Sequence, residues 1–94
     1  MQINKSQKYK RELQEILTYI AKDKVSAMIN FRKELNHSLS QLKIFPYKYR
    51  QSFYFKEINI RDMIFKGYTV IYEIFENKIE IMTIFNQNKP NDKR

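Results

Sequence analysis

The chain of 94 residues contains no cysteine, one glycine, two prolines and a single histidine. Without cysteine it can form neither a disulfide framework nor a thiolate metal site. One glycine cannot build a phosphate-binding loop. His37 lies inside a helical pattern with no acidic neighbour and no second ligand at metal-binding spacing, so it supports neither a Ser-His-Asp arrangement nor a metal site. We therefore expect no cofactor and no bound metal.

Long apolar runs are also missing. No stretch approaches the roughly 18 apolar residues that span a membrane, and residues 1–5 lack the apolar core of a signal peptide. Hydrophobic residues make up 43% of the chain and aromatic residues 15%, which favours a folded core. We expect one cytoplasmic domain over residues 1–94, no membrane partner, and a loose polar tail over residues 87–94.

Positive charge exceeds negative charge, with 18 Lys and Arg against 10 acids and a net charge of +8. Such a surface favours nucleic acid, an anionic assembly or an acidic protein as partner. The excess is densest over residues 43–66, which hold six cations and two acids. Within it, residues 43–50 alternate cations with aromatics. They form either a nucleic-acid-binding loop or a loop whose apolar side chains close the end of the core.

The first half of the chain has the period of helices. Apolar residues recur at helical spacing over residues 9–20 and again over residues 28–42. Ser6 and Asp23 stand where N-caps are expected, and the short link around Asp23 predicts an antiparallel helical hairpin. Pro46 excludes further helix, because it lacks an amide hydrogen.

The second half changes to a period of two. Residues rich in β-branched and aromatic side chains occupy three runs, 58–65, 68–75 and 79–85. Gly67 separates the first two runs, where a tight turn needs a positive φ angle. These runs predict an antiparallel meander, to which residues 51–55 and residues 2–4 add an irregular strand and a short edge strand. The fold class is therefore α+β, with the N-terminal helical hairpin packed on a small antiparallel β-sheet.

The order of elements and one strand pattern resemble the RelE/ParE superfamily of type II toxins. The pattern is an Arg, then Gly-Tyr, an aliphatic pair and a second Tyr, found here as Arg61, Gly67-Tyr68, Val70-Ile71 and Tyr72. The closing strand and its polar end, residues 79–90, are also similar to the family, and the likeness runs from about residue 6 to residue 90. It implies a toxin that inhibits growth when free of a small cognate antitoxin, encoded by an adjacent gene.

Members of this superfamily divide by target. RelE-like members cleave messenger RNA in the ribosome without a metal, whereas ParE-like members poison DNA gyrase and are not known as enzymes. The cations that the resemblance leads us to expect in a ribonuclease are replaced here by Ile60, Asp62 and Thr69, and the usual His of the end motif is Asn86. The residues favour the ParE-like branch and gyrase. The ribosome and mRNA remain the alternative target, and a weakened toxin or a plain nucleic-acid-binding module also stays open.

We predict a target-facing surface of cations and one amide. It comprises Lys48, Arg50, Arg61, Lys66, Asn86 and Lys89. These side chains would dock the target electrostatically and, in a ribonuclease, stabilise the phosphate. Arg61 alternates with isoleucines, so it either faces solvent beside the helices or lines a concave sheet surface. An exposed apolar patch that awaits the antitoxin would explain the high apolar content.

Overall fold

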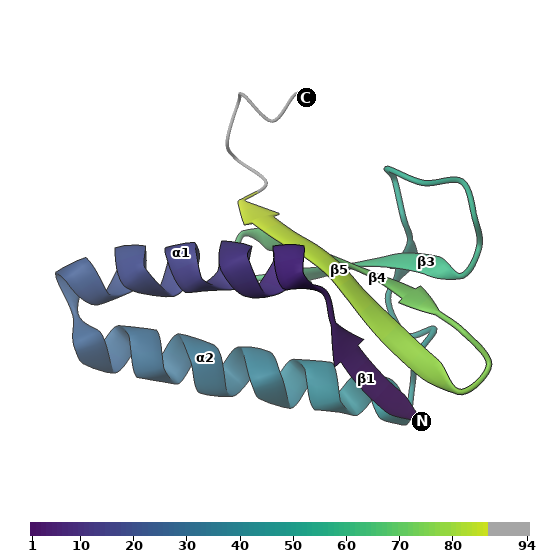
Figure 1. Cartoon of the computed structure of the whole chain (residues 1–94), viewed down its shortest axis with the longest axis horizontal. Helices are drawn as coiled ribbons and strands as arrows, with labels where there is room; N and C mark the ends of the chain where they lie inside the picture. The colour runs from purple at the N-terminus through teal and green to yellow at the C-terminus, as the bar shows by residue number, and fades with distance from the viewer. Residues whose placement is uncertain (87–94) are drawn as a thin grey trace.

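The computed structural model describes residues 1–86. Its elements, in chain order, are β1 (Gln2–Lys5), α1 (Gln7–Asp23), α2 (Val25–Ser40), the 3-10 turn η1 (Gln41–Lys43), β2 (Arg50–Gln51), β3 (Ile60–Phe65), β4 (Tyr68–Ile74) and β5 (Lys78–Asn86). The two helices form a hairpin alongside a twisted five-stranded sheet (Figure 1). The α+β class and the helical hairpin packed on the sheet are confirmed.

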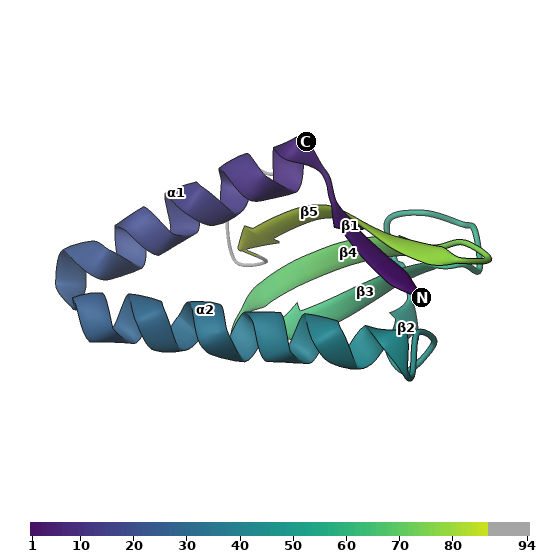
Figure 2. The ribbon, with the colours of Figure 1, turned by 60° about the horizontal axis from the view of Figure 1, so that its bottom comes forward.

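The two helices start in different ways. Ser6 caps α1 as predicted, because its Oγ accepts a hydrogen bond of 2.9 Å from the Tyr9 amide. The predicted cap of α2 is wrong. Asp23 is the last residue of α1, and Lys24 alone links the helices with an extended backbone and no side-chain cap. Lys24 itself occupies the N-cap position of α2, and its ammonium group cannot accept the hydrogen bond that a capping side chain receives. Away from this link the helices splay apart (Figure 2).

The sheet has the strand order β1-β5-β4-β3-β2 and is mixed. The meander β3-β4-β5 is antiparallel as predicted, but β1 runs parallel to β5, so the expectation of a wholly antiparallel sheet is wrong. The chain leaves β1 through the whole helical hairpin, and such a crossover permits the parallel orientation. The strand predicted over residues 51–55 shrinks to Arg50–Gln51, and β3 begins at Ile60, two residues later than expected.

The turn between β3 and β4 confirms the role of the glycine. Lys66 has φ of 50° and Gly67 has φ of 85°. Two residues with positive φ make the hairpin turn whose twist matches that of the strands. Lys66 takes this conformation although it carries a Cβ atom, which costs free energy that Gly67 does not pay.

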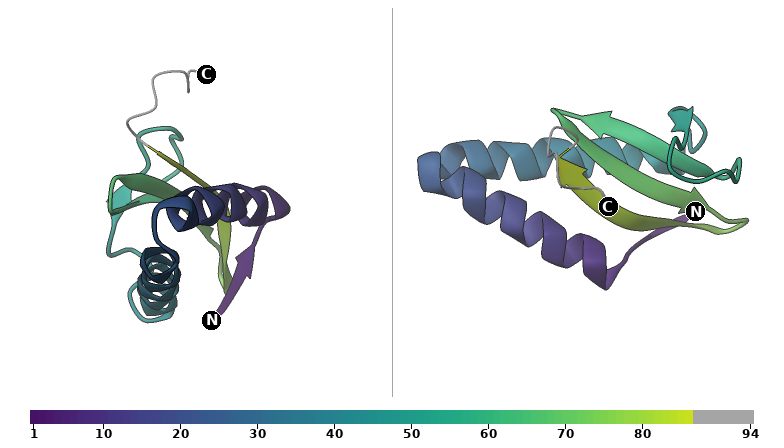
Figure 3. Two further views of the ribbon diagram at one scale, coloured as in Figure 1. Left: turned by 90° about the vertical axis from the view of Figure 1, so that its left-hand side faces the viewer. Right: turned by 90° about the horizontal axis from the view of Figure 1, so that it is seen from above.

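The core lies between the helices and one face of the sheet. Its buried members are Tyr9, Leu17, Phe31, Leu35, Leu39, Leu42, Met63, Val70, Tyr72, Ile74, Ile79, Ile81 and Ile84. On β3, Met63 faces the helices, so Arg61 and Phe65 share that face while Ile60 and Ile64 lie on the other. The views of Figure 3 place α1 on the side of β5 and α2 on the side of β3.

Candidate functional site

The predicted contact residues divide between the two ends of β3. Arg61 lies at the start of the strand and Arg50 pairs with its third residue, Asp62. Lys66 lies in the turn after the strand, and Asn86 pairs with Tyr68 just beyond that turn. Five residue steps separate Arg61 from Lys66, about 17 Å along a strand. Lys89 lies outside the described residues, as does the predicted tail 87–94.

Arg61 is half-buried on the helix-facing side of the sheet and binds the chain that crosses it. Its Nε donates to the Ile58 carbonyl and its Nη1 to the Tyr49 carbonyl, both at 3.0 Å. Its guanidinium carbon lies 4.6 Å from the centre of the Tyr47 ring. Two donors and one face of the guanidinium are thus engaged within the molecule. We expected Arg61 either to face solvent beside the helices or to line a concave sheet surface, and neither placement describes this arrangement. Its guanidinium instead holds the segments that contain Tyr49 and Ile58.

Arg50 forms an ion pair with a buried carboxylate. Oδ2 of Asp62 accepts from Nη2 of Arg50 at 3.4 Å and from the Phe53 amide at 2.9 Å. The Asp62 side chain is 0% exposed, so it depends on these partners for compensation. Arg50 also stacks 3.7 Å over the Phe53 ring, yet its side chain stays 39% exposed. It can therefore hold the loop and still meet a partner.

A buried phenol fastens the segment that follows η1. The Tyr72 hydroxyl donates to the Pro46 carbonyl at 2.7 Å. Burial raises the pKa of Tyr72 well above its usual value, and the charge of Arg61 offsets this only in part. The phenol is therefore neutral at physiological pH and acts as a hydrogen-bond donor. Its hydrogen bond to Pro46 fixes the position of the loop.

The segment from residue 44 to residue 58, which we call the aromatic connection, displays large apolar side chains to solvent. Its exposed members are Ile44, Phe45, Tyr47, Phe53, Tyr54, Phe55 and Ile58. Ile44 is 64% exposed and Phe45 59%, so they do not close the end of the core, as one interpretation of this loop required. A pocket of about 440 Å³ lies elsewhere, beside α1, whereas residues 44–48 frame a wider opening of about 610 Å³. Exposed aromatics of this density mark an interaction surface.

Sequence reasoning placed the cations of this surface but missed most of its aromatics. Three consecutive aromatic residues, Phe53, Tyr54 and Phe55, fit neither the helical nor the alternating spacing of the predicted elements. Their position outside both patterns was the sign in the sequence that they could be exposed. Tyr54 packs edge-on against Phe85 of β5 at 5.4 Å between ring centroids. The second part of the aromatic connection therefore reaches across the sheet.

The turn after β3 carries less uncompensated positive charge than the aromatic connection. Nζ of Lys66 forms an ion pair with Glu34 of α2. Phe31 packs edge-on against Phe65 and Tyr68, with ring centroids 5.2 and 5.5 Å apart. Lys66 therefore presents less uncompensated charge than Lys48, which has no acidic partner among residues 1–86.

Within residues 1–86, no three His, Cys, Asp or Glu side chains gather as metal ligands. In the same part of the chain, no helix has the length and apolarity needed to cross a membrane. His37 is exposed near the end of α2.

A family model described as the ParE toxin of type II toxin–antitoxin system, parDE, matches residues 3–90. The chain belongs to the ParE toxin family. A solved structure of the chromosomal ParDE toxin–antitoxin system from P. aeruginosa is similar, with a TM-score of 0.75 and 13% identity over 92% of this chain and 95% of that chain. At this identity the likeness shows the fold. No curated protein matches the chain in sequence.

Membership of the ParE toxin family confirms the resemblance to the RelE/ParE superfamily and its ParE-like branch. The structure adds a physical detail to that assignment. Ile60, Asp62 and Thr69 are only 5%, 1% and 1% exposed. The positions at which we would expect the cations of a ribonuclease therefore lie inside this ParE protein.

Proposed function

We propose that this ParE family member arrests growth by poisoning DNA gyrase when its antitoxin is absent. The burial of Ile60, Asp62 and Thr69 is the observation that carries the proposal. RNA cleavage needs a cation over the scissile phosphate and groups that move protons. Side chains enclosed in the sheet cannot contact RNA, so the ribonuclease alternative would need a site built from other residues.

The proposed contact with gyrase is the aromatic connection with its cations. Lys48 is exposed and Arg50 is partly exposed, and both lie among aromatic side chains that can be buried at an interface. Arg61 acts as a positioning residue, since its guanidinium binds two carbonyls of the same segment. Lys66 and Asn86 form a separate candidate contact at the far end of β3, and Lys89 remains a candidate on sequence alone.

The proposed partner is a small antitoxin encoded by the adjacent gene, with both proteins in the cytoplasm. Family membership and the +8 net charge support an acidic segment in that partner. Such a partner would cover the toxin and keep it from gyrase.

Pulse labelling after tightly induced expression tests the target. We expect DNA synthesis to collapse first while translation continues, and purified gyrase to accumulate cleaved plasmid when the protein is added. Early collapse of translation would overturn gyrase poisoning in favour of mRNA cleavage. Tight, strongly salt-dependent binding to naked DNA or RNA without growth arrest would instead indicate a nucleic-acid-binding module.

A further inference from the structure

Asp62 of β3 carries a charge where the sheet is closed to solvent. Among the charged side chains of residues 1–86, only that of Asp62 is buried. Its Oδ2 has two partners, but its Oδ1 has no hydrogen-bond partner within the same residues. A buried carboxylate that is satisfied on one side alone costs free energy, so its presence calls for an explanation.

The two partners of Asp62 contact each other on the surface above it. Oδ2 accepts from Nη2 of Arg50 at 3.4 Å and from the Phe53 amide at 2.9 Å. The guanidinium carbon of Arg50 in turn lies 3.7 Å from the centre of the Phe53 ring. The three residues close a ring of contacts. One buried carboxylate thereby fixes two side chains that solvent reaches, and Phe53 is 75% exposed.

Other contacts fix the course of the loop around this pair. The Ser52 amide donates to the Ile60 carbonyl at 2.8 Å, and the Tyr54 amide donates to Ser52 Oγ at 3.0 Å. Tyr54 also packs edge-on against Phe85. None of these contacts involves Asp62, so what its carboxylate adds is the orientation of the exposed pair.

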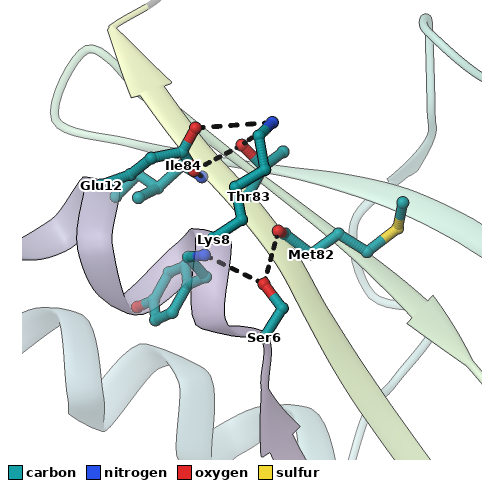
Figure 4. Close-up of polar contacts among 7 residues, drawn as sticks. Ser6, Lys8, Glu12, Met82, Thr83 and Ile84 are labelled. Atoms are coloured by element: carbon teal, nitrogen blue, oxygen red, sulfur yellow. Dashed lines mark hydrogen bonds and ion pairs between the residues drawn. The ribbon is translucent and has the colours of Figure 1, made fainter.

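A second carboxylate has the same kinds of partner but a different consequence. Glu12 of α1 accepts from the Ile84 amide at 3.1 Å and forms an ion pair with Lys8 at 3.5 Å (Figure 4). It accepts as well from Oγ1 of Thr83. These contacts join a helix to β5, whereas those of Asp62 hold side chains of an exposed loop. Glu12 therefore offers a matched comparison.

An oriented arginine on an aromatic ring is well suited to bind a protein partner. Arginine and aromatic side chains are enriched among the residues that contribute most to binding at protein interfaces. Only Nη2 of Arg50 makes a side-chain hydrogen bond within residues 1–86, which leaves further donors for a partner. A pair that is already ordered loses less conformational entropy when it binds.

We propose that Asp62 is a positioning residue of the gyrase-docking surface, whose buried carboxylate orients the stacked side chains of Arg50 and Phe53 toward the target. The identity of the target rests on the proposed function. The inference also explains the acid at Asp62, a position where the sequence led us to expect a cation in a ribonuclease.

Asp62→Asn tests the proposal in the full chain. Asparagine has nearly the same shape and can still accept from the Phe53 amide, but it carries no charge to hold Arg50. The Arg50 charge left behind reaches solvent, so the thermal midpoint should change little. We expect inhibition of purified gyrase to weaken by about tenfold, because two side chains must then be ordered on binding. Glu12→Gln makes the same change of charge and should inhibit as the unmodified chain does.

Nuclear magnetic resonance of the free protein measures the orientation itself. The ring current of Phe53 shifts the side-chain protons of a guanidinium stacked on it upfield. In Asp62→Asn we expect the Arg50 protons to lose this shift while signals of the helices stay in place. Phe53→Ala changes an exposed side chain, and it should weaken inhibition as much as Asp62→Asn does.

A double variant separates orientation from stability. Arg50→Ala leaves the buried Asp62 without its cation, so the thermal midpoint should fall. Adding Asp62→Asn removes that buried charge and should restore the midpoint, while inhibition stays as weak as in Arg50→Ala. A merely structural role of Asp62 would restore both together.

Three results would overturn the proposal and leave gyrase poisoning in place. They are full inhibition by Asp62→Asn or by Phe53→Ala, unchanged Arg50 proton shifts in Asp62→Asn, and inhibition that follows the thermal midpoint across the variants. An unmodified chain that does not inhibit gyrase would instead overturn the proposed function, and the docking role of Asp62 with it.

Discussion

At the scale of single residues, the cations of this protein differ in what they do. Arg61 donates hydrogen bonds to the carbonyls of Tyr49 and Ile58, whereas Lys48 is exposed and has no acidic partner in the described range. Sequence position made them equivalent, because both are basic residues in a basic segment. The structural role of Arg61 depends on the segment around Tyr49, which passes close to β3 in the folded chain. No local sequence pattern predicts that contact.

Arg61→Lys separates charge from geometry. The variant keeps the positive charge but loses the planar group that reaches two carbonyls at once. We expect the free energy of unfolding to fall by about 1–3 kcal/mol, the range for a half-buried residue that leaves carbonyls unpaired. Urea denaturation measures this, with Lys48→Ala as the control that should unfold as the unmodified chain does. An Arg61→Lys variant of full stability would show that the contacts seen here are dispensable.

The buried hydroxyl of Tyr9 should make the stability of the protein depend on pH in the alkaline range. Its hydroxyl is fully buried without a hydrogen-bond partner in the described range, and burial raises the pKa of Tyr9 from 10.0 to about 12. Between these values the unfolded chain loses a proton that the folded chain keeps, so stability falls as pH rises from about 10 toward 12. We expect Tyr9→Phe to lessen this loss and to leave stability at pH 7 equal or higher. Urea midpoints of both proteins at pH 7 and near pH 11 test this prediction. An equal loss of stability between these pH values in Tyr9→Phe and in the unmodified chain would contradict the role given to Tyr9.

At the scale of elements, the helices and the meander could be predicted because their apolar spacing is local. The helical spacing of the apolar residues between 9 and 42 is visible within each segment, although packing on the sheet stabilises both helices. The parallel pairing of β1 depends instead on where α1 and α2 carry the chain, and the cap expected at Asp23 disappeared because α1 extended through it. The pairing of β1 was set by a distant element, whereas the cap at Asp23 was set by the exact residue at which α1 ends.

The β3–β4 turn can be tested as an element. Gly67 has φ of 85°, and a Cβ atom there would meet nothing within 4 Å. Gly67→Ala should therefore cost only the backbone strain of a positive φ, about 1 kcal/mol, with the fold retained. A Tm measurement checks this, and Gly67→Asn serves as the matched variant because asparagine tolerates that conformation better. A loss several times larger would mean that the turn does more than join the strands.

At the scale of the whole molecule, charge and apolar surface are distributed unevenly. The aromatic connection gathers exposed cations and aromatics, whereas the pocket beside α1 is lined by Glu12 and Glu15 and by no Lys or Arg. A single list of basic residues could not show this distribution, because Arg61 lies near the start of β3 and Lys66 in the turn that follows the strand.

Charge reversal in the aromatic connection and in the turn after β3 tests which surface contacts gyrase. Under the proposed function, Lys48→Glu places an acid in the aromatic connection, and Lys66→Glu makes the same change at the far turn. We expect Lys48→Glu to reduce gyrase inhibition by about tenfold or more, because the proposed electrostatic docking depends on positive charge at this surface. Lys66→Glu should retain most of the inhibition, since Lys66 is already paired with Glu34. Plasmid cleavage by purified gyrase compares the two at equal net charge, and a stronger effect of Lys66→Glu would move the contact surface to the far end of the sheet.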